Sequence, residues 1–163
     1  MSKHIVSLEE LQDRALYFSK YILGLRFNFD IGYIPEYDEF GNSIQLLGRF
    51  IHDKESYITE DDQDEVYCEI EINETLSNDV LRLNDTLLHE LIHFKLWYMG
   101  YDSQDGDKQF EDELKRYHIS SNYSNTFDKK TRKWLDKIDK EYMQKYEDMY
   151  QEYIKHSKME RKQ

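Results

Sequence analysis

The amino-acid sequence predicts an α+β domain with an N-terminal helix, a small, mostly antiparallel three-stranded sheet, a buried central helix and further C-terminal helices. Three observations lead to this fold class. The chain opens with an amphipathic helical pattern, three segments of alternating apolar residues follow between residues 25 and 72, and residues 80–97 are apolar on nearly all sides. Alternation with a period of two is typical of strands, whereas apolar residues all round are typical of a core helix.

The N-terminal helix is predicted from its start signal and from its apolar stripe. Ser7 and Glu10 have the spacing of a capping box, in which a hydroxyl and a carboxylate satisfy backbone N–H groups at a helix start. Gly24 follows the stripe and is a suitable residue to end the helix. The stripe consists of Leu8, Leu11, Ala15, Phe18 and Ile22.

Three strands are predicted from alternating apolar residues. The first runs from Leu25 to about Pro35, and the second runs from about Ser43 to His52, with a bulge at Gly48 as one interpretation. The third occupies residues 66–72, directly before the central helix, and is a candidate edge for binding an extended peptide. An ordinary sheet strand is the alternative. The acidic run at residues 53–65 is most simply a solvated loop, because it lacks the spacing of an EF-hand calcium loop.

The central helix contains the sequence pattern H-E-x-x-H. His89 and His93 are four residues apart, so a helix places both imidazoles on one face, one turn apart. Glu90 lies where its carboxylate can reach a metal-held water without being a ligand. The pattern is the signature of zincins, and buried histidines in an apolar helix require a partner or a metal.

A catalytic zinc takes three protein ligands, so a third ligand is expected downstream of the helix. Residues 101–110 form a polar loop that runs into a second helix with Phe110, Leu114 and Tyr117 on one face. The candidates for the third ligand are Asp105, Asp107 and His118, and spacing does not choose among them. Asp107 could instead be the N-cap residue of the following helix. His118 could instead be an ordinary surface histidine.

The segment Asp105 to Phe110 and the motif at residues 86–93 resemble the SprT-like metallopeptidases. Bacterial members of that family carry the third histidine in a motif like H-x-D-x-x-F. In this chain Asp107 and Phe110 match that motif, and Asp105 occupies the histidine position. The segments 47–50 and 70–73 also look like the strands that precede the metal helix, so the resemblance covers about residues 7–118.

The resemblance implies a zincin-like fold and a zinc ion held by His89, His93 and Asp105. Carboxylates are good zinc ligands, so a site with two histidines and one carboxylate is compatible with hydrolysis. The same set also suits Fe(II), but Glu90 beside the ligands favours hydrolysis by a general base. We therefore expect a zinc metalloendopeptidase acting on protein or peptide substrates. Four residues are unranked candidates for stabilising the oxyanion: Tyr98, Tyr101, Tyr117 and His118.

Two other functions are compatible with the motif. A repressor-cleaving metallopeptidase that resembles ImmA/IrrE proteins would share H-E-x-x-H, but it would not be expected to carry the segment from Asp105 to Phe110. A non-catalytic module with a structural or lost metal is the second alternative. An open fourth coordination position argues against a structural metal, because structural zinc is normally held by four protein ligands. Glu90, which would ligate nothing, argues against a lost metal.

Charge is distributed unevenly along the 163 residues, whose net charge is −12. Residues 1–126 carry 26 acidic and 11 basic residues, whereas residues 127–163 carry 8 acidic and 11 basic ones. An acidic body repels phosphate, so direct nucleic-acid binding by it is not expected, although some SprT-like proteins cut proteins crosslinked to DNA. Cys68 is the only cysteine, and no apolar run is long enough for a membrane span or a signal peptide, so a cytoplasmic location is expected.

The chain is therefore divided into a metallopeptidase domain at residues 1–126 and a helical extension at residues 127–163. The extension is predicted to be one charged helix from Asp128 to about His156. Its apolar stripe is mainly aromatic and fits a heptad coiled coil poorly, so it is expected to pack on the body or to mediate self-association. The stripe consists of Trp134, Ile138, Tyr142, Tyr146, Tyr150 and Tyr153.

Overall fold

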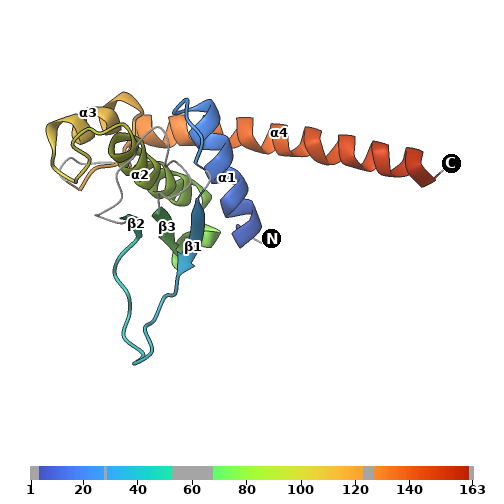
Figure 1. The fold of residues 1–163 in the computed structure, drawn as a ribbon. Coiled ribbons are helices and arrows are strands. Elements are labelled where there is room, and N and C mark those ends of the chain that lie inside the picture. Colours follow the sequence, from blue (N-terminus) through green and yellow to red (C-terminus); the bar gives the residue numbers. More distant parts are fainter. Residues whose placement is uncertain (1–3, 28, 53–67, 123–126, 162–163) are drawn as a thin grey trace, which may run out of the picture.

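The computed structural model has an α+β architecture in which α1 and α2 pack against a small three-stranded sheet (Figure 1). The predicted fold class is confirmed at this level. Residues 4–27, 29–52, 68–122 and 127–161 are described. In chain order the elements are α1 (Leu8–Tyr21), β1 (Asp30–Ile34), β2 (Gly48–His52), β3 (Cys68–Asn73), the 3-10 helix η2 (Glu74–Asn78), α2 (Val80–Tyr98), α3 (Lys108–Arg116) and α4 (Lys129–Arg161).

Helix α1 begins where the capping box predicts. The Ser7 hydroxyl accepts a hydrogen bond from the Glu10 backbone N–H at 3.1 Å, which satisfies one of the free donors of the first turn. The apolar stripe is confirmed except at its first position, because Leu8 is largely exposed. The stripe residues in the core are Leu11, Ala15 and Phe18.

The sheet has the strand order β1-β3-β2, with β1 parallel and β2 antiparallel to β3. It is therefore a mixed sheet, and the prediction of a mostly antiparallel one is wrong. Alternating apolar residues indicate that a strand is half-buried, but not the direction of its neighbour. The prediction that the third strand offers an edge is also wrong: β3 is central, Ile70 and Ile72 are fully buried, and β2 is the edge strand beside α2.

Two strands are shorter than predicted. β1 begins at Asp30 instead of Leu25, and β2 begins at Gly48 instead of Ser43. The chain just before β2 is held by the Asn73 side chain, whose amide donates to the backbone oxygens of Ile44 and Leu46 at 3.1 and 2.9 Å. Gly48 pairs in register with Ile72, so the interpretation of Gly48 as a bulge is wrong.

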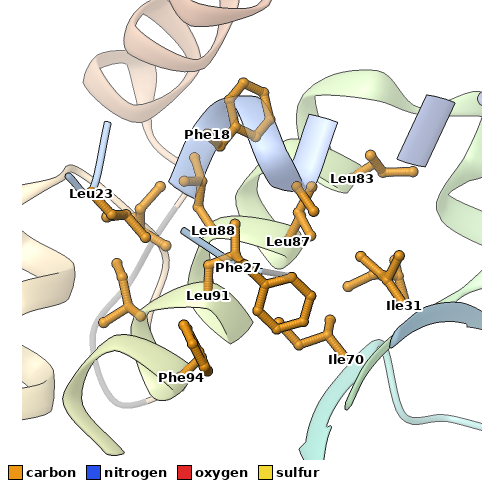
Figure 2. Packing of buried hydrophobic residues seen from close by; sticks show 14 of the residues in the cluster. Phe18, Leu23, Phe27, Ile31, Ile70, Leu83, Leu87, Leu88, Leu91 and Phe94 are labelled. Atoms are coloured by element: carbon orange, nitrogen blue, oxygen red, sulfur yellow. The ribbon is translucent and has the colours of Figure 1, made fainter. Parts of the chain in front are cut away.

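Helix α2 is the predicted buried helix and forms the centre of the core. The Asp79 carboxylate accepts a hydrogen bond from the Arg82 N–H at its start, and Gly100, with φ of 82°, follows its end in the left-handed region that favours glycine. Figure 2 shows α2 between α1 and the sheet. The buried α2 residues in that view are Leu83, Leu87, Leu88, Leu91 and Phe94, which pack with Phe18, Phe27, Ile31 and Ile70.

Helices α3 and α4 follow as predicted, but α4 is longer. It continues to Arg161 and leaves the body over its second half (Figure 1). Its first half belongs to the body, because Leu135, Ile138 and Tyr142 are buried in the same core as α1 and α2. The division into residues 1–126 and 127–163 stays a prediction.

Two further predictions concern calcium binding and membrane-spanning helices. The acidic run at residues 53–65, considered above for calcium, lies outside the described residues. Among the described helices, none combines the length and the apolar character needed to cross a membrane.

Candidate metal centre

Helix α2 places the two motif histidines on one side, one turn apart. The ring centroids of His89 and His93 are 5.0 Å apart. One ligand atom from each of His89, Glu90 and His93 lies within 4.8 Å of the others. The i and i+4 spacing thus produces the paired imidazoles expected of the motif.

Asp105 reaches both histidines from the loop between α2 and α3. Its Oδ1 atom lies 3.0 Å from Nε2 of His89 and 3.3 Å from Nε2 of His93. A tetrahedral zinc ion with bonds of ~2.0–2.1 Å has ligand atoms ~3.3 Å apart. The spacing of these atoms therefore suits one zinc ion. Glu90 also belongs to the group that could hold a metal ion, but Asp105 is the carboxylate with one oxygen in contact with Nε2 of both histidines.

Backbone carbonyls fix the orientation of both imidazole rings. Nδ1 of His89 lies 2.8 Å from the Ser120 carbonyl oxygen, and Nδ1 of His93 lies 2.5 Å from that of Ser103. A carbonyl oxygen can only accept, so each Nδ1 must carry the hydrogen. Each Nε2 therefore presents its lone pair toward Asp105 when the ring is neutral. Outer partners of this kind commonly orient metal-binding histidines.

Phe110 supports both rings from α3. Its ring stacks on His93 with centroids 3.9 Å apart and planes 12° apart, and it meets His89 edge-on at 5.2 Å. Phe110 is fully buried, so it excludes water from this side of the imidazoles. Phe110 was singled out in the sequence only by its match to the H-x-D-x-x-F motif, and these contacts show that its ring supports both imidazoles.

The loop that carries Asp105 is held by its own neighbours. The Asp107 carboxylate accepts a hydrogen bond from the Gln104 N–H at 2.9 Å, and that of Glu111 accepts one from the Gly106 N–H at 3.0 Å. Asp107 precedes α3 as its N-cap residue, but its side chain makes no capping hydrogen bond. It stabilises the loop and is not among the side chains that face the histidines.

The remaining ligand candidate lies elsewhere. His118 follows α3, and its ring centroid is 6.1 Å from that of Trp134 on α4. It is exposed and is not part of the cluster formed by His89, Glu90 and His93. Of the three candidates, only Asp105 is brought to the histidines.

Glu90 is buried against the first residue of β2. A Cβ atom at Gly48 would lie 2.7 Å from Cγ2 of Thr86 and 3.1 Å from Oε1 of Glu90, so only glycine allows this approach of β2 to α2. Burial raises the pKa of Glu90 to about 7, with the charge of Asp105 acting in the same direction and that of His89 opposing it. A carboxyl with such a pKa can both take up and release a proton near neutral pH.

The pKa values of the other three groups reflect burial and their mutual contacts. Burial alone lowers the pKa of His89, but the hydrogen bond with Asp105 and the charge of Glu90 outweigh it and raise this pKa. Burial lowers the pKa of His93. The hydrogen bond with His89 lowers the pKa of Asp105. The carboxylate of Asp105 is therefore ionised at neutral pH.

Two hollows adjoin the cluster and meet at Leu46, Gly48, Glu90 and Asp105. One extends toward the start of α2 and the segment after α3, and the other extends along β2. Among the described strands β2 lies at an edge of the sheet, and Gly48, Phe50 and His52 of β2 line this second hollow. The other residues lining the first hollow include Arg82, Asp85 and Asn122, and those lining the second include Phe50, His52 and Gln104.

Some residues of the site have no signal in the sequence, and some predicted ones are not found there. The carbonyl groups of Ser103 and Ser120 are backbone atoms, which no residue pattern identifies. Gly48 could have been found, because glycine within a strand often marks a close approach. None of the four oxyanion candidates, Tyr98, Tyr101, Tyr117 and His118, is among the residues lining these two hollows.

The chain was also compared with known proteins. No protein-family model, curated protein or solved structure matches it. The resemblance to SprT-like metallopeptidases therefore stays a prediction from the motif residues.

Proposed function

We propose that this chain is a zinc-dependent metallopeptidase that hydrolyses peptide bonds of protein substrates, with a zincin-like fold similar to that of SprT-like metallopeptidases. His89, His93 and Asp105 are assigned as ligands and Glu90 as the general base. One observation carries the proposal. Nε2 of both histidines lies within 3.3 Å of one Asp105 oxygen, while Nδ1 of both already faces a backbone carbonyl.

This convergence favours a cation at its centre. A neutral imidazole with hydrogen on Nδ1 offers only a lone pair at Nε2, and an ionised carboxylate offers only acceptors. One proton on His89 can bridge to Asp105, but it leaves the lone pair of His93 facing the same oxygen at 3.3 Å. A divalent metal ion satisfies all three atoms, and this donor set suits zinc.

Zinc at this position would supply a Lewis acid for the scissile carbonyl and a water molecule with a pKa lowered toward ~7. Glu90 accounts for the proton transfers. Its carboxylate takes the proton of the attacking water and later passes it to the leaving amine. The pKa of about 7 suits both transfers. The position of Glu90 beside the ligands also favours hydrolysis over the Fe(II) oxygenase chemistry that this ligand set allows.

The surroundings of the cluster suit an extended peptide. An edge strand can bind such a segment by backbone hydrogen bonds, and β2 is an edge strand among the described elements and lies next to Glu90. The two hollows continue to either side of Glu90 and Asp105, so a chain could pass through them without ending at the cluster. This arrangement favours cleavage within a chain, that is, an endopeptidase.

The first experiment is elemental analysis of the purified wild type, Asp105→Ala and Asp107→Ala after identical dialysis. We expect about one zinc per chain in the wild type and in Asp107→Ala, and loss of zinc in Asp105→Ala. Asp107→Ala is the matched control, because it removes a carboxylate from the same loop. Absence of bound metal in the wild type after zinc is supplied would contradict the proposal.

The second experiment separates catalysis from metal binding. Glu90→Gln preserves shape and should keep its zinc, while hydrolysis of an unfolded protein substrate should fall by at least ~10²-fold. Unchanged hydrolysis would remove Glu90 from the mechanism. A zinc-loaded wild type that cleaves no protein or peptide would favour the non-catalytic alternative.

A further inference from the structure

Helix α4 carries one continuous apolar seam, and only its first half is covered by the body. Leu135, Ile138 and Tyr142 are buried against α1 and α2. The seam then continues at positions i, i+3, i+4 and i+7, the spacing of a helix face that packs against another surface. These positions are Tyr146, Met149, Tyr150 and Tyr153, whose exposed fractions are 46%, 58%, 53% and 70%.

The second half of α4 makes its last described side-chain contacts with the body near Lys145. Lys145 donates a hydrogen bond to the Tyr21 hydroxyl, and its Nζ lies 3.6 Å from the centroid of that ring. From Tyr146 to Arg161 the helix runs on for roughly 24 Å away from the body (Figure 1). An isolated helix of this length is marginally stable in water, so it needs a covering surface.

We propose that the second half of α4 pairs antiparallel with the same segment of a second copy, giving a two-fold symmetric dimer. Charge selects this occupant. Residues 144–152 contain three carboxylates and one lysine, whereas residues 153–161 contain two lysines, one arginine and one glutamate. An antiparallel copy places each negative half against a positive half, twice by symmetry, whereas a parallel copy would place like charges together.

A hollow at the base of the free segment offers a place for the end of the partner helix. It lies between α1 and α4, with apolar walls from Leu16, Tyr17 and Met149 and a polar rim from Asp13, Lys20 and Lys145. In this register residues 144–152 face residues 161–153 of the partner, so the C-terminal end of the partner helix lies over this hollow. The surface thus continues from the free helix onto the body.

The exposed area is close to what a stable dimer needs. Six large apolar side chains, four of them tyrosines, are each roughly half exposed on this surface. An aromatic side chain can bury ~150–250 Å², so together the six can bury about 600 Å² per copy. Interfaces of standard size bury about 800 Å² per partner, so these side chains supply most of that area. They are Leu16, Tyr21, Tyr146, Met149, Tyr150 and Tyr153.

Sedimentation velocity of the full chain tests the dimer. We expect the wild type to be dimeric at about 100 µM and to dissociate on dilution. Tyr150→Glu places one carboxylate in the seam of each copy, so the dissociation constant should rise at least ~100-fold. Gln151→Glu is the matched control, because it adds the same charge one residue away on the opposite face, and its dissociation constant should stay within about threefold of the wild type.

Helicity provides a second readout. Far-UV circular dichroism of the wild type should lose helical signal on dilution, and Tyr150→Glu should show the diluted signal at all concentrations, while both proteins keep the same thermal transition of the body. A monomeric wild type at about 100 µM would overturn the proposal, and a different partner would then have to cover the seam. A dimer that Tyr150→Glu and Gln151→Glu affect equally would also overturn it. The proposal does not depend on the metal or on catalysis.

Discussion

At the scale of single residues, Phe110 is uncharged and cannot be a ligand, yet it contacts both imidazoles of the candidate metal centre. Phe110→Leu removes the stacked ring and lets His93 rotate. We expect the zinc dissociation constant to rise about tenfold, as is typical when an outer support of a ligand is lost. Competition with a chromophoric chelator measures the zinc dissociation constant of each variant.

Leu114→Ala is the control for Phe110→Leu. It removes a side chain that is also buried on α3 but is not in ring contact with the imidazoles. It should lower the free energy of unfolding by ~2–5 kcal/mol and leave zinc affinity unchanged. Equal losses of affinity in both variants would show that α3 acts only through stability.

Cys68 gives a prediction for stability at high pH. Burial, helped by the negative charges of Asp30 and Glu69, raises the pKa of its thiol from 9.0 to about 12 in the folded chain. As pH rises above 9, the unfolded state loses the proton and the folded state does not, so stability falls until the folded thiol also ionises near 12. Between pH 8 and 10 the free energy of unfolding of the wild type should fall by about 1 kcal/mol more than that of Cys68→Ala.

Urea unfolding at several pH values measures this difference. Many tyrosines and lysines titrate in the same range, so only the difference between the two proteins reports on Cys68. Parallel stability curves for wild type and Cys68→Ala would contradict the prediction.

The candidate site was predictable from sequence only where local geometry decides the arrangement. The helix spacing alone brings His89 and His93 together. The position of Asp105 depends on how the loop before α3 folds back, and residue spacing left Asp107 and His118 as alternatives. The carbonyls that orient the rings depend on backbone paths that side-chain types do not determine.

At the scale of elements, α1, α2 and α4 are joined by one buried arginine. Arg14 is fully buried; its Nη1 donates to Asp139 at 2.6 Å and to Asn84 at 3.1 Å, and its Nε donates to Glu10 at 2.8 Å. Asp139→Ala leaves this charge with fewer partners. We expect the free energy of unfolding to fall by about 3 kcal/mol, measured by urea titration.

Asp136→Ala is the matched control for Asp139→Ala. Its carboxylate lies on the same helix and pairs with Lys140 at 2.9 Å, but both side chains are largely exposed. An exposed pair of this kind contributes ~0–1 kcal/mol. If Asp139→Ala lowers the free energy of unfolding no more than Asp136→Ala does, the buried network does not attach α4 to the body.

The elements themselves differ in how well the sequence predicted them. The helices follow from a period that each segment carries in itself, together with caps such as Ser7. The strands depend on partners: the parallel pairing of β1 with β3 and the central place of β3 are set by the path of the chain between them. The first part of the predicted second strand is not a strand, and the side-chain amide of Asn73 donates hydrogen bonds to the backbone oxygens of Ile44 and Leu46 there.

At the scale of the whole molecule, the part of the chain that carries the candidate cluster is strongly acidic. Residues 1–126 have 26 acidic and 11 basic residues. The two hollows beside the cluster add little to this charge, because Asp85, Glu90 and Asp105 line them together with Arg49 and Arg82, and a bound Zn²⁺ would contribute two positive charges. The excess of acidic over basic residues, 11 − 26 = −15, far exceeds these local charges, so the field of the body attracts basic peptides and repels acidic ones.

If the proposed peptidase activity is correct, this field should set substrate preference. Two peptides of equal length, differing only in lysine or glutamate at positions flanking the cleaved bond, should be cleaved with kcat/KM values that differ about tenfold in favour of lysine at about 10 mM salt. At about 1 M salt the screening length shrinks from ~30 Å to ~3 Å, so the ratio should approach one. A ratio that salt does not change would assign the preference to direct contacts in the groove, and a preference for glutamate would contradict the electrostatic argument.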